Sequence, residues 1–217
     1  MAIVVRTLSE QVFEIVREQI VTGKLVGNTP IRQDALATEL GVSKIPLREA
    51  LARLEQEGLL TSHANRGYAV RPMSAHEADD IFALRLSIEP NAAAYASTVA
   101  TASDHEIAKV AFEELDSAAG ERLAEVAIAN RVFHTALVRP GRRLLTTQTV
   151  ERLAILAERY VVAHLQPAGR EDRAHLEHRE LLDTWLARDE ARLTTLLASH
   201  IGSTLLDLRG QFESSSD

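Results

Sequence analysis

The segment 8–22 carries apolar residues at intervals of three to four positions, which is the period of a helix with one buried face. These positions are Val12, Phe13, Val16 and Ile20. Ser9 is placed to cap the helix at its start, and Gly23 ends it. The chain therefore opens with an amphipathic helix that needs other elements to cover its apolar side.

Two shorter helical patterns follow at about 32–40 and 44–57, and Gly41 lies between them. Ser43 is placed to cap the second of these helices. From Leu59 to Arg71 the apolar residues alternate around turn residues, which predicts a short β-hairpin. Helix, helix, tight turn, helix and hairpin is the order of a winged helix-turn-helix.

Residues after Pro72 keep a helical period throughout. The expected helices cover about 75–100, 104–118, 122–139, 142–165, 173–187 and 189–209. Capping boxes are expected at Ser74–Glu77 and Ser103–Glu106. The fold class is therefore mainly α, with a winged helix-turn-helix domain over 1–72 and an antiparallel all-helical bundle over 73–217.

Charge is divided unevenly between these two parts. The net charge of the whole chain is −7, yet residues 1–72 hold nine Lys/Arg against eight Asp/Glu. The excess of acidic residues therefore lies in residues 73–217. Any contact with DNA phosphates must come from the first part, and a nearly neutral module favours two copies on a dimer. The chain has no cysteine and no long apolar run. We therefore expect a cytoplasmic protein that does not enter a membrane.

The helix at 44–57 has a composition suited to the major groove of DNA. Its packing face is Leu47, Ala50, Leu51 and Leu54. Lys44 and Arg48 are four residues apart and share the flank beside that face, while Ser43 is placed to contact a phosphate. Arg66 at the hairpin tip and Arg32 are further candidates for DNA contact. The alternative is that these basic residues form an ordinary solvated helix face.

The stretch LATELGVSKIPLREALARLEQEGLL, followed by NRGYAV, resembles the GntR family of bacterial transcription regulators. The resemblance implies that the second helix of the motif binds operator DNA. One difference is Lys44, because the family usually has Arg there. Lys cannot form the bidentate fork that Arg makes to guanine, so either the sequence preference differs or Lys44 contacts phosphate alone.

Histidines on three later helices form the second candidate site. Asn130 and His134 are four residues apart, a spacing that places two metal ligands on one helix face. His178 and His200 each lie beside an apolar stripe, so their rings are expected to point inward. The alternative is three unrelated core histidines, and His175 competes with His178 for nearly the same face.

Residues 75–210 resemble the FCD effector domain of the FadR-like branch of that family. The resemblance implies that Asn130, His134, His178 and His200 hold a divalent metal ion, such as zinc, beside a small effector. It also implies that Arg85 grips an effector carboxylate, whereas helical spacing alone allows an ion pair with Glu89. Asn130 brings no charge, so the site favours an anionic ligand.

These observations predict a ligand-responsive transcription regulator, and not an enzyme. We expect a homodimer on double-stranded operator DNA, with repression relieved by a small organic acid. One alternative is a metal-dependent hydrolase, but the chain lacks a His-Glu-x-x-His helix. The other alternative is a helical module that binds a protein partner.

Overall fold

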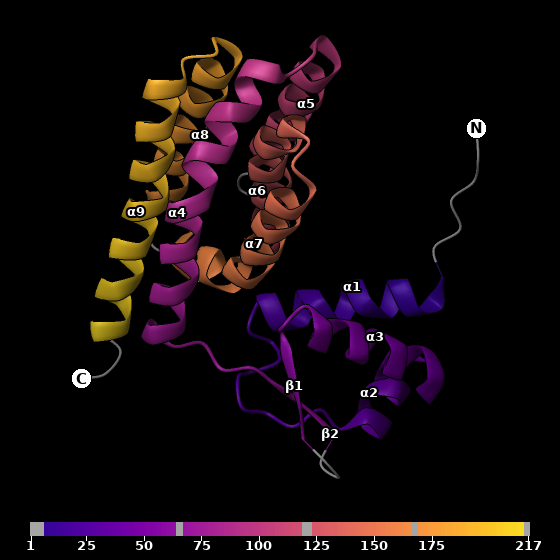
Figure 1. Cartoon of the computed structure of the whole chain (residues 1–217). Helices are drawn as coiled ribbons and strands as arrows, with labels where there is room; N and C mark the ends of the chain where they lie inside the picture. Colours follow the sequence, from indigo (N-terminus) through magenta and orange to yellow (C-terminus); the bar gives the residue numbers. More distant parts are fainter. Residues whose placement is uncertain (1–6, 64–66, 119–122, 166–168, 215–217) are drawn as a thin grey trace. The chain divides into compact units, whose positions relative to one another are not determined.

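The computed structural model describes residues 7–63, 67–118, 123–165 and 169–214. It divides the chain into two compact units, Met1–Met73 and Ser74–Asp217. Within the described residues, no helix has the length and apolar character needed to cross a membrane. The expected fold class is confirmed: in the described part of the chain, three helices and a two-stranded wing precede an all-helical second unit (Figure 1).

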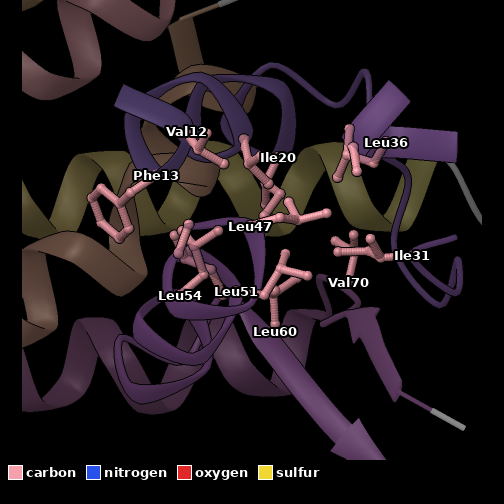
Figure 2. Packing of buried hydrophobic residues seen from close by; sticks show 14 residues of the cluster. Val12, Phe13, Ile20, Ile31, Leu36, Leu47, Leu51, Leu54, Leu60 and Val70 are labelled. Atoms are coloured by element: carbon pink, nitrogen blue, oxygen red, sulfur yellow. The ribbon is translucent and has the colours of Figure 1, made fainter. Parts of the chain in front are cut away.

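The first unit contains α1 (Leu8–Val21), α2 (Gln33–Leu40), α3 (Lys44–Gln56), β1 (Leu60–His63) and β2 (Gly67–Val70). The strands pair antiparallel, with Leu60 opposite Val70. Figure 2 shows side chains of α1, α3 and the hairpin pointing toward one another. This core buries the apolar stripes of α1 and α3 together, so the remaining faces of α3 are left for solvent.

The start of α1 differs from the expectation that Ser9 caps it. Thr7 is the cap, and it forms a capping box with Glu10. The Thr7 amide donates to the Glu10 carboxylate at 2.7 Å, and the Glu10 amide donates to the Thr7 hydroxyl. The T-x-x-E spacing satisfies two helix-end amides, which a cap at Ser9 would not do.

The second unit is a bundle of α4 (Ala75–Val99), α5 (Ala102–Ala118), α6 (Leu123–Val138), α7 (Leu144–Leu165), α8 (Arg170–Leu186) and α9 (Glu190–Ser214). A short 3₁₀ turn at Arg139–Gly141 separates α6 from α7, where Pro140 and Gly141 stop the helix. In Figure 1, α9 lies along α4, and α6 packs against α5 and α7. The bundle brings α4, α6, α8 and α9 around one interior.

Caps in the second unit match part of one expectation and correct another. Ser74 caps α4 by accepting from the Glu77 amide, and Asp189 accepts from the Arg192 amide at the start of α9. The box expected at Ser103–Glu106 is instead formed by Thr101 and Asp104. Helix α5 therefore begins earlier than expected, because Thr101 and Asp104 have the same i, i+3 spacing and satisfy each other.

Candidate functional site

Helix α3 presents a buried face and an exposed face, as a recognition helix requires. The four residues of its packing face, Leu47, Ala50, Leu51 and Leu54, are each at most 1% exposed. Ser43, Lys44, Ile45 and Arg48 are all exposed on the other side. Ile45 is 71% exposed, so an apolar side chain is available there for a thymine methyl group.

The first turn of α2 contacts two basic residues of α3, Lys44 and Arg48. The Nε atom of Arg48 donates to the Oε1 atom of Gln33 at 3.2 Å. The Nζ atom of Lys44 lies 2.5 Å from the Oδ1 atom of Asp34. Gln33 and Asp34 were not among the residues expected from sequence. Each is close in space to a residue more than nine positions away, and no helical period shows such a contact.

The remaining residues predicted to contact DNA have different environments. Ser43 occupies the cap position of α3, but its side chain makes no capping hydrogen bond, which corrects the expectation that it caps the helix. Arg32 is exposed at the start of α2 and likewise makes no side-chain cap. Arg66 lies outside the described residues. A further cation of α3, Arg53, stacks over the Phe13 ring at 4.0 Å, so it supports the packing of α1 on α3.

Three histidines from different helices meet inside the second unit. His134 comes from α6, His178 from α8 and His200 from α9, and one ring nitrogen of each lies within 4.8 Å of the others. The ring centroids of His178 and His200 are 4.6 Å apart, and those of His134 and His200 are 5.2 Å apart. Histidines distant in sequence thus converge on one point.

Burial keeps two of these imidazoles neutral. Desolvation lowers the pKa of His134 well below its usual value, and it lowers the pKa of His178 in the same way. Neither ring nitrogen of His134 has a hydrogen-bond partner among the described residues, nor does the Nε2 atom of His178. Unpaired buried polar atoms are costly, and neutral imidazole nitrogens are the ligands that a divalent transition ion prefers. The donor set therefore fits a metal ion.

His200 is oriented by a carboxylate outside the cluster. Its Nδ1 atom lies 2.6 Å from the Oε2 atom of Glu177 on α8. A proton on Nδ1 donates to that carboxylate, which leaves the lone pair of Nε2 for the centre of the cluster. Metal-binding histidines are commonly held in this way.

A cavity of about 40 Å³ adjoins the histidines, which is room for a few water-sized groups. His178, His200, Asn130 and Arg85 all line it. Asn130 lies one turn before His134 on α6. The apolar part of the lining is formed by Phe112, Leu115, Val126, Val161, Leu165 and Ile201. A small ligand with a polar end fits this combination.

Arg85 forms the ion pair with Glu89 that helical spacing allows, and it also faces the cavity. It is buried and pairs with Glu89, with its Nε atom 2.7 Å from Oε1 and its Nη2 atom 3.2 Å from Oε2. It also lines the cavity. The Oε2 atom of Glu89 lies 3.7 Å from the Nδ1 atom of His134. Glu89 thus links the guanidinium to the histidine cluster.

His175 lines the same cavity but is engaged on another side. Its Nδ1 atom lies 2.8 Å from the Oδ1 atom of Asp116, and its ring packs against Phe112. The histidine that joins His134 and His200 is therefore His178, one turn further along α8.

Comparisons with known proteins identify a known protein family or domain for each of the two units. The family described as "Bacterial regulatory proteins, gntR family" matches residues 8–70, and the FCD domain matches residues 80–203. The transcriptional regulator BphR of Paraburkholderia xenovorans is 32% identical over 94% of this chain and 86% of its own. The chain belongs to the GntR family.

A second relative of this GntR regulator supports the same assignment, and a solved structure shares its fold. The HTH-type transcriptional repressor GlaR of Escherichia coli is 31% identical over 85% of this chain and 88% of its own. The structure of E. coli McbR/YncC matches with a TM-score of 0.77 and 23% identity, over 96% of this chain and 100% of that one. The GntR regulator is thus a ligand-responsive, DNA-binding transcription regulator, and the enzyme alternative is excluded by its family.

Proposed function

We propose that this GntR regulator is a homodimeric repressor whose second unit holds a divalent metal ion and a small organic acid. The observation that carries the proposal is the cluster of His134, His178 and His200, in which both ring nitrogens of His134 and the Nε2 atom of His178 have no hydrogen-bond partner among the described residues. Relatives named as repressors include GlaR and a probable D-xylose utilization operon repressor. Repression is proposed here by analogy with them.

The three imidazoles and Asn130 would hold the ion, and zinc suits this set of nitrogen ligands. When bound, the ion supplies positive charge to the cavity. All four ligands are neutral, so an anionic effector would complete the charge balance. Arg85 would bind the effector carboxylate with the part of its guanidinium that Glu89 does not occupy.

DNA binding is proposed for the exposed side of α3. Arg48 would read a base edge with its two terminal nitrogens, since its Nε atom is already held by Gln33. Ser43 and Lys44 would contact phosphates, and Arg32 and Arg66 would add contacts beside the helix. The two DNA-binding units of a dimer would recognise two half-sites of one operator.

Helix α7 offers a route from the cavity to the start of the second unit. It contributes Val161 and His164 to the cavity. The neighbouring Tyr160 donates its hydroxyl to the Glu77 carboxylate at 2.7 Å and accepts from the Ser74 amide at 3.2 Å. Ser74 begins the second unit, directly after the DNA-binding unit. A ligand that shifts α7 would therefore change the first turn of α4. It would then also change the relative populations of two conformations of the regulator that differ in their affinity for DNA.

The test uses a duplex selected by the protein from a random pool. Metal-loaded protein is screened against small organic acids by thermal shift, and acids that stabilise it are added to the protein–duplex complex. The proposal expects release of the duplex by such an acid, and loss of this response after chelation or in Arg85→Met. If acids bind but never change duplex affinity, the regulatory part of the proposal is wrong.

A further inference from the structure

The first turn of α2 gives Lys44 and Arg48 of α3 partners of different charge. Gln33 accepts from Arg48 through a neutral amide at 3.2 Å, so the positive charge of Arg48 is not offset by this partner. Asp34 faces Lys44 with a carboxylate at 2.5 Å, which balances the charge of Lys44. Of these two adjacent α2 residues, Gln33 therefore binds Arg48 without offsetting its charge, whereas Asp34 places a negative charge against that of Lys44.

We propose that Asp34 is a positioning residue that holds Lys44 back from DNA phosphates and so limits the affinity of this regulator for duplexes of any sequence. The inference rests on the proposed placement of α3 against DNA. The side chain of Lys44 is 57% exposed and that of Asp34 is 80% exposed. Neither side chain is needed in the core, so the pair is free to exchange partners when a duplex approaches.

A phosphate that contacts Lys44 must compete with the Asp34 carboxylate and is repelled by it. Binding to DNA of arbitrary sequence depends almost wholly on such phosphate contacts. Residues 1–72 carry only one more basic than acidic residue, so one carboxylate beside α3 has a large relative effect. Arg48 keeps its charge and its fork for base recognition.

Weak affinity for DNA of arbitrary sequence helps a regulator that must occupy a small number of operator sites. A genome offers millions of competing non-specific sites, so occupancy of the operator depends on the ratio of the two affinities. Asp34 lowers the contribution of Lys44, whose contact with a phosphate carries no sequence information. The contact made by Arg48, which discriminates between bases, is left in place.

The test measures binding of the full-length protein to a short duplex of random sequence, by fluorescence anisotropy over a range of salt concentrations. Asp34→Asn is expected to bind about three- to tenfold more tightly at low salt, with a slope of log affinity against log salt steeper by about one unit. Asp34→Glu retains the carboxylate and is expected to behave as the wild type.

Glu39→Gln is the matched control, because it removes the same charge from the other end of α2. Glu39 pairs with Lys24, with 3.6 Å between the charged atoms. This variant is expected to change random-duplex affinity by less than about twofold, as for other surface charge changes. If Asp34→Asn binds no more tightly than Glu39→Gln, the inference is overturned.

A second pair of variants tests whether Asp34 acts through Lys44. Lys44→Gln is expected to weaken random-duplex binding, and Asp34→Asn is expected to add little in that background. An equal gain in both backgrounds would show a general charge effect and would overturn the inference. If Lys44→Gln does not weaken binding at all, the placement of α3 against DNA is wrong as well.

Discussion

The Nδ1 atom of His200 lies 2.6 Å from the Oε2 atom of Glu177, so a carboxylate on α8 sets the orientation of a ring on α9. Glu177 also faces Arg173, whose Nε atom is 3.7 Å from its Oε1 atom. The histidine cluster is thereby connected to charged groups at its edge. Such support raises the basicity of a ligand and fixes its tautomer.

We predict that Glu177→Gln weakens metal binding about tenfold, because the amide orients His200 less strongly than the carboxylate does. A competition titration with a coloured chelator measures the change. Glu180→Gln is the control, since Glu180 lies on the same helix and pairs with Arg192 at 2.7 Å. Equal metal affinity in wild type and Glu177→Gln would show that Glu177 does not support a metal site.

Tyr160→Phe is predicted to lower the free energy of unfolding of the second unit by about 1–2 kcal/mol, because the hydroxyl bonds to a charged acceptor. Burial, followed by the hydrogen bond to Glu77, raises the pKa of Tyr160, so the donor keeps its proton. The chain has one tryptophan, the fully buried Trp185, and its fluorescence during urea unfolding reports the loss.

Tyr95→Phe serves as the comparison for that measurement. The ring of Tyr95 lies 3.7 Å from the guanidinium of Arg143, and phenylalanine preserves this contact. A change in the free energy of unfolding below about 0.5 kcal/mol is therefore expected. If the two variants unfold alike, the contact of Tyr160 with the start of α4 contributes nothing to stability. Loss of the effector response in Tyr160→Phe would further support α7 as the route from the cavity.

His164 is expected to make the metal-free second unit sensitive to acid. Burial lowers the pKa of His164 to about 4, although Asp207 opposes this shift, and Arg170, Arg173 and His200 add to it. The unfolded chain takes up the proton near its ordinary pKa of 6.5, before the folded chain does. Stability is therefore full above about pH 6.5 and falls as the pH drops toward 4.

The variant that isolates this effect is His164→Gln, which cannot take up a proton. Urea unfolding followed by Trp185 at several pH values, with chelator present, is expected to show a smaller acid loss than in wild type. His76→Gln removes an exposed histidine from α4 and is expected to leave the acid loss unchanged. An acid loss in His164→Gln as steep as in wild type would contradict the assignment to His164.

Arg48→Ala is predicted to weaken binding to the selected duplex about 10- to 100-fold, the range for loss of one bidentate base contact. Because Arg48 is exposed, the thermal stability of the protein should not change. Lys24→Ala removes another exposed cation of the first unit and is expected to have a small effect. Unchanged affinity of Arg48→Ala would mean that another surface reads the operator.

Periodicity was sufficient to predict the fold class and the inward orientation of the three histidines, whereas their convergence on one site was implied by the resemblance to the FCD domain. Each histidine sits beside an apolar helical stripe, and the stripes must face one interior. The partners Gln33 and Glu177 were not singled out as site residues, because a contact between helices depends on how the helices cross. The cap at Thr7 was missed for a different reason: the T-x-x-E spacing was present, but Ser9 lay nearer the apolar stripe.

The most direct test of the proposed function is the metal content of the purified protein and of His134→Ala combined with His200→Ala. Elemental analysis with native mass spectrometry should find about one divalent ion per chain in the wild type and none in the double variant. Circular dichroism should show that both remain helical. Equal metal content in the two proteins, or no metal in the wild type after incubation with zinc, would contradict the proposed metal site.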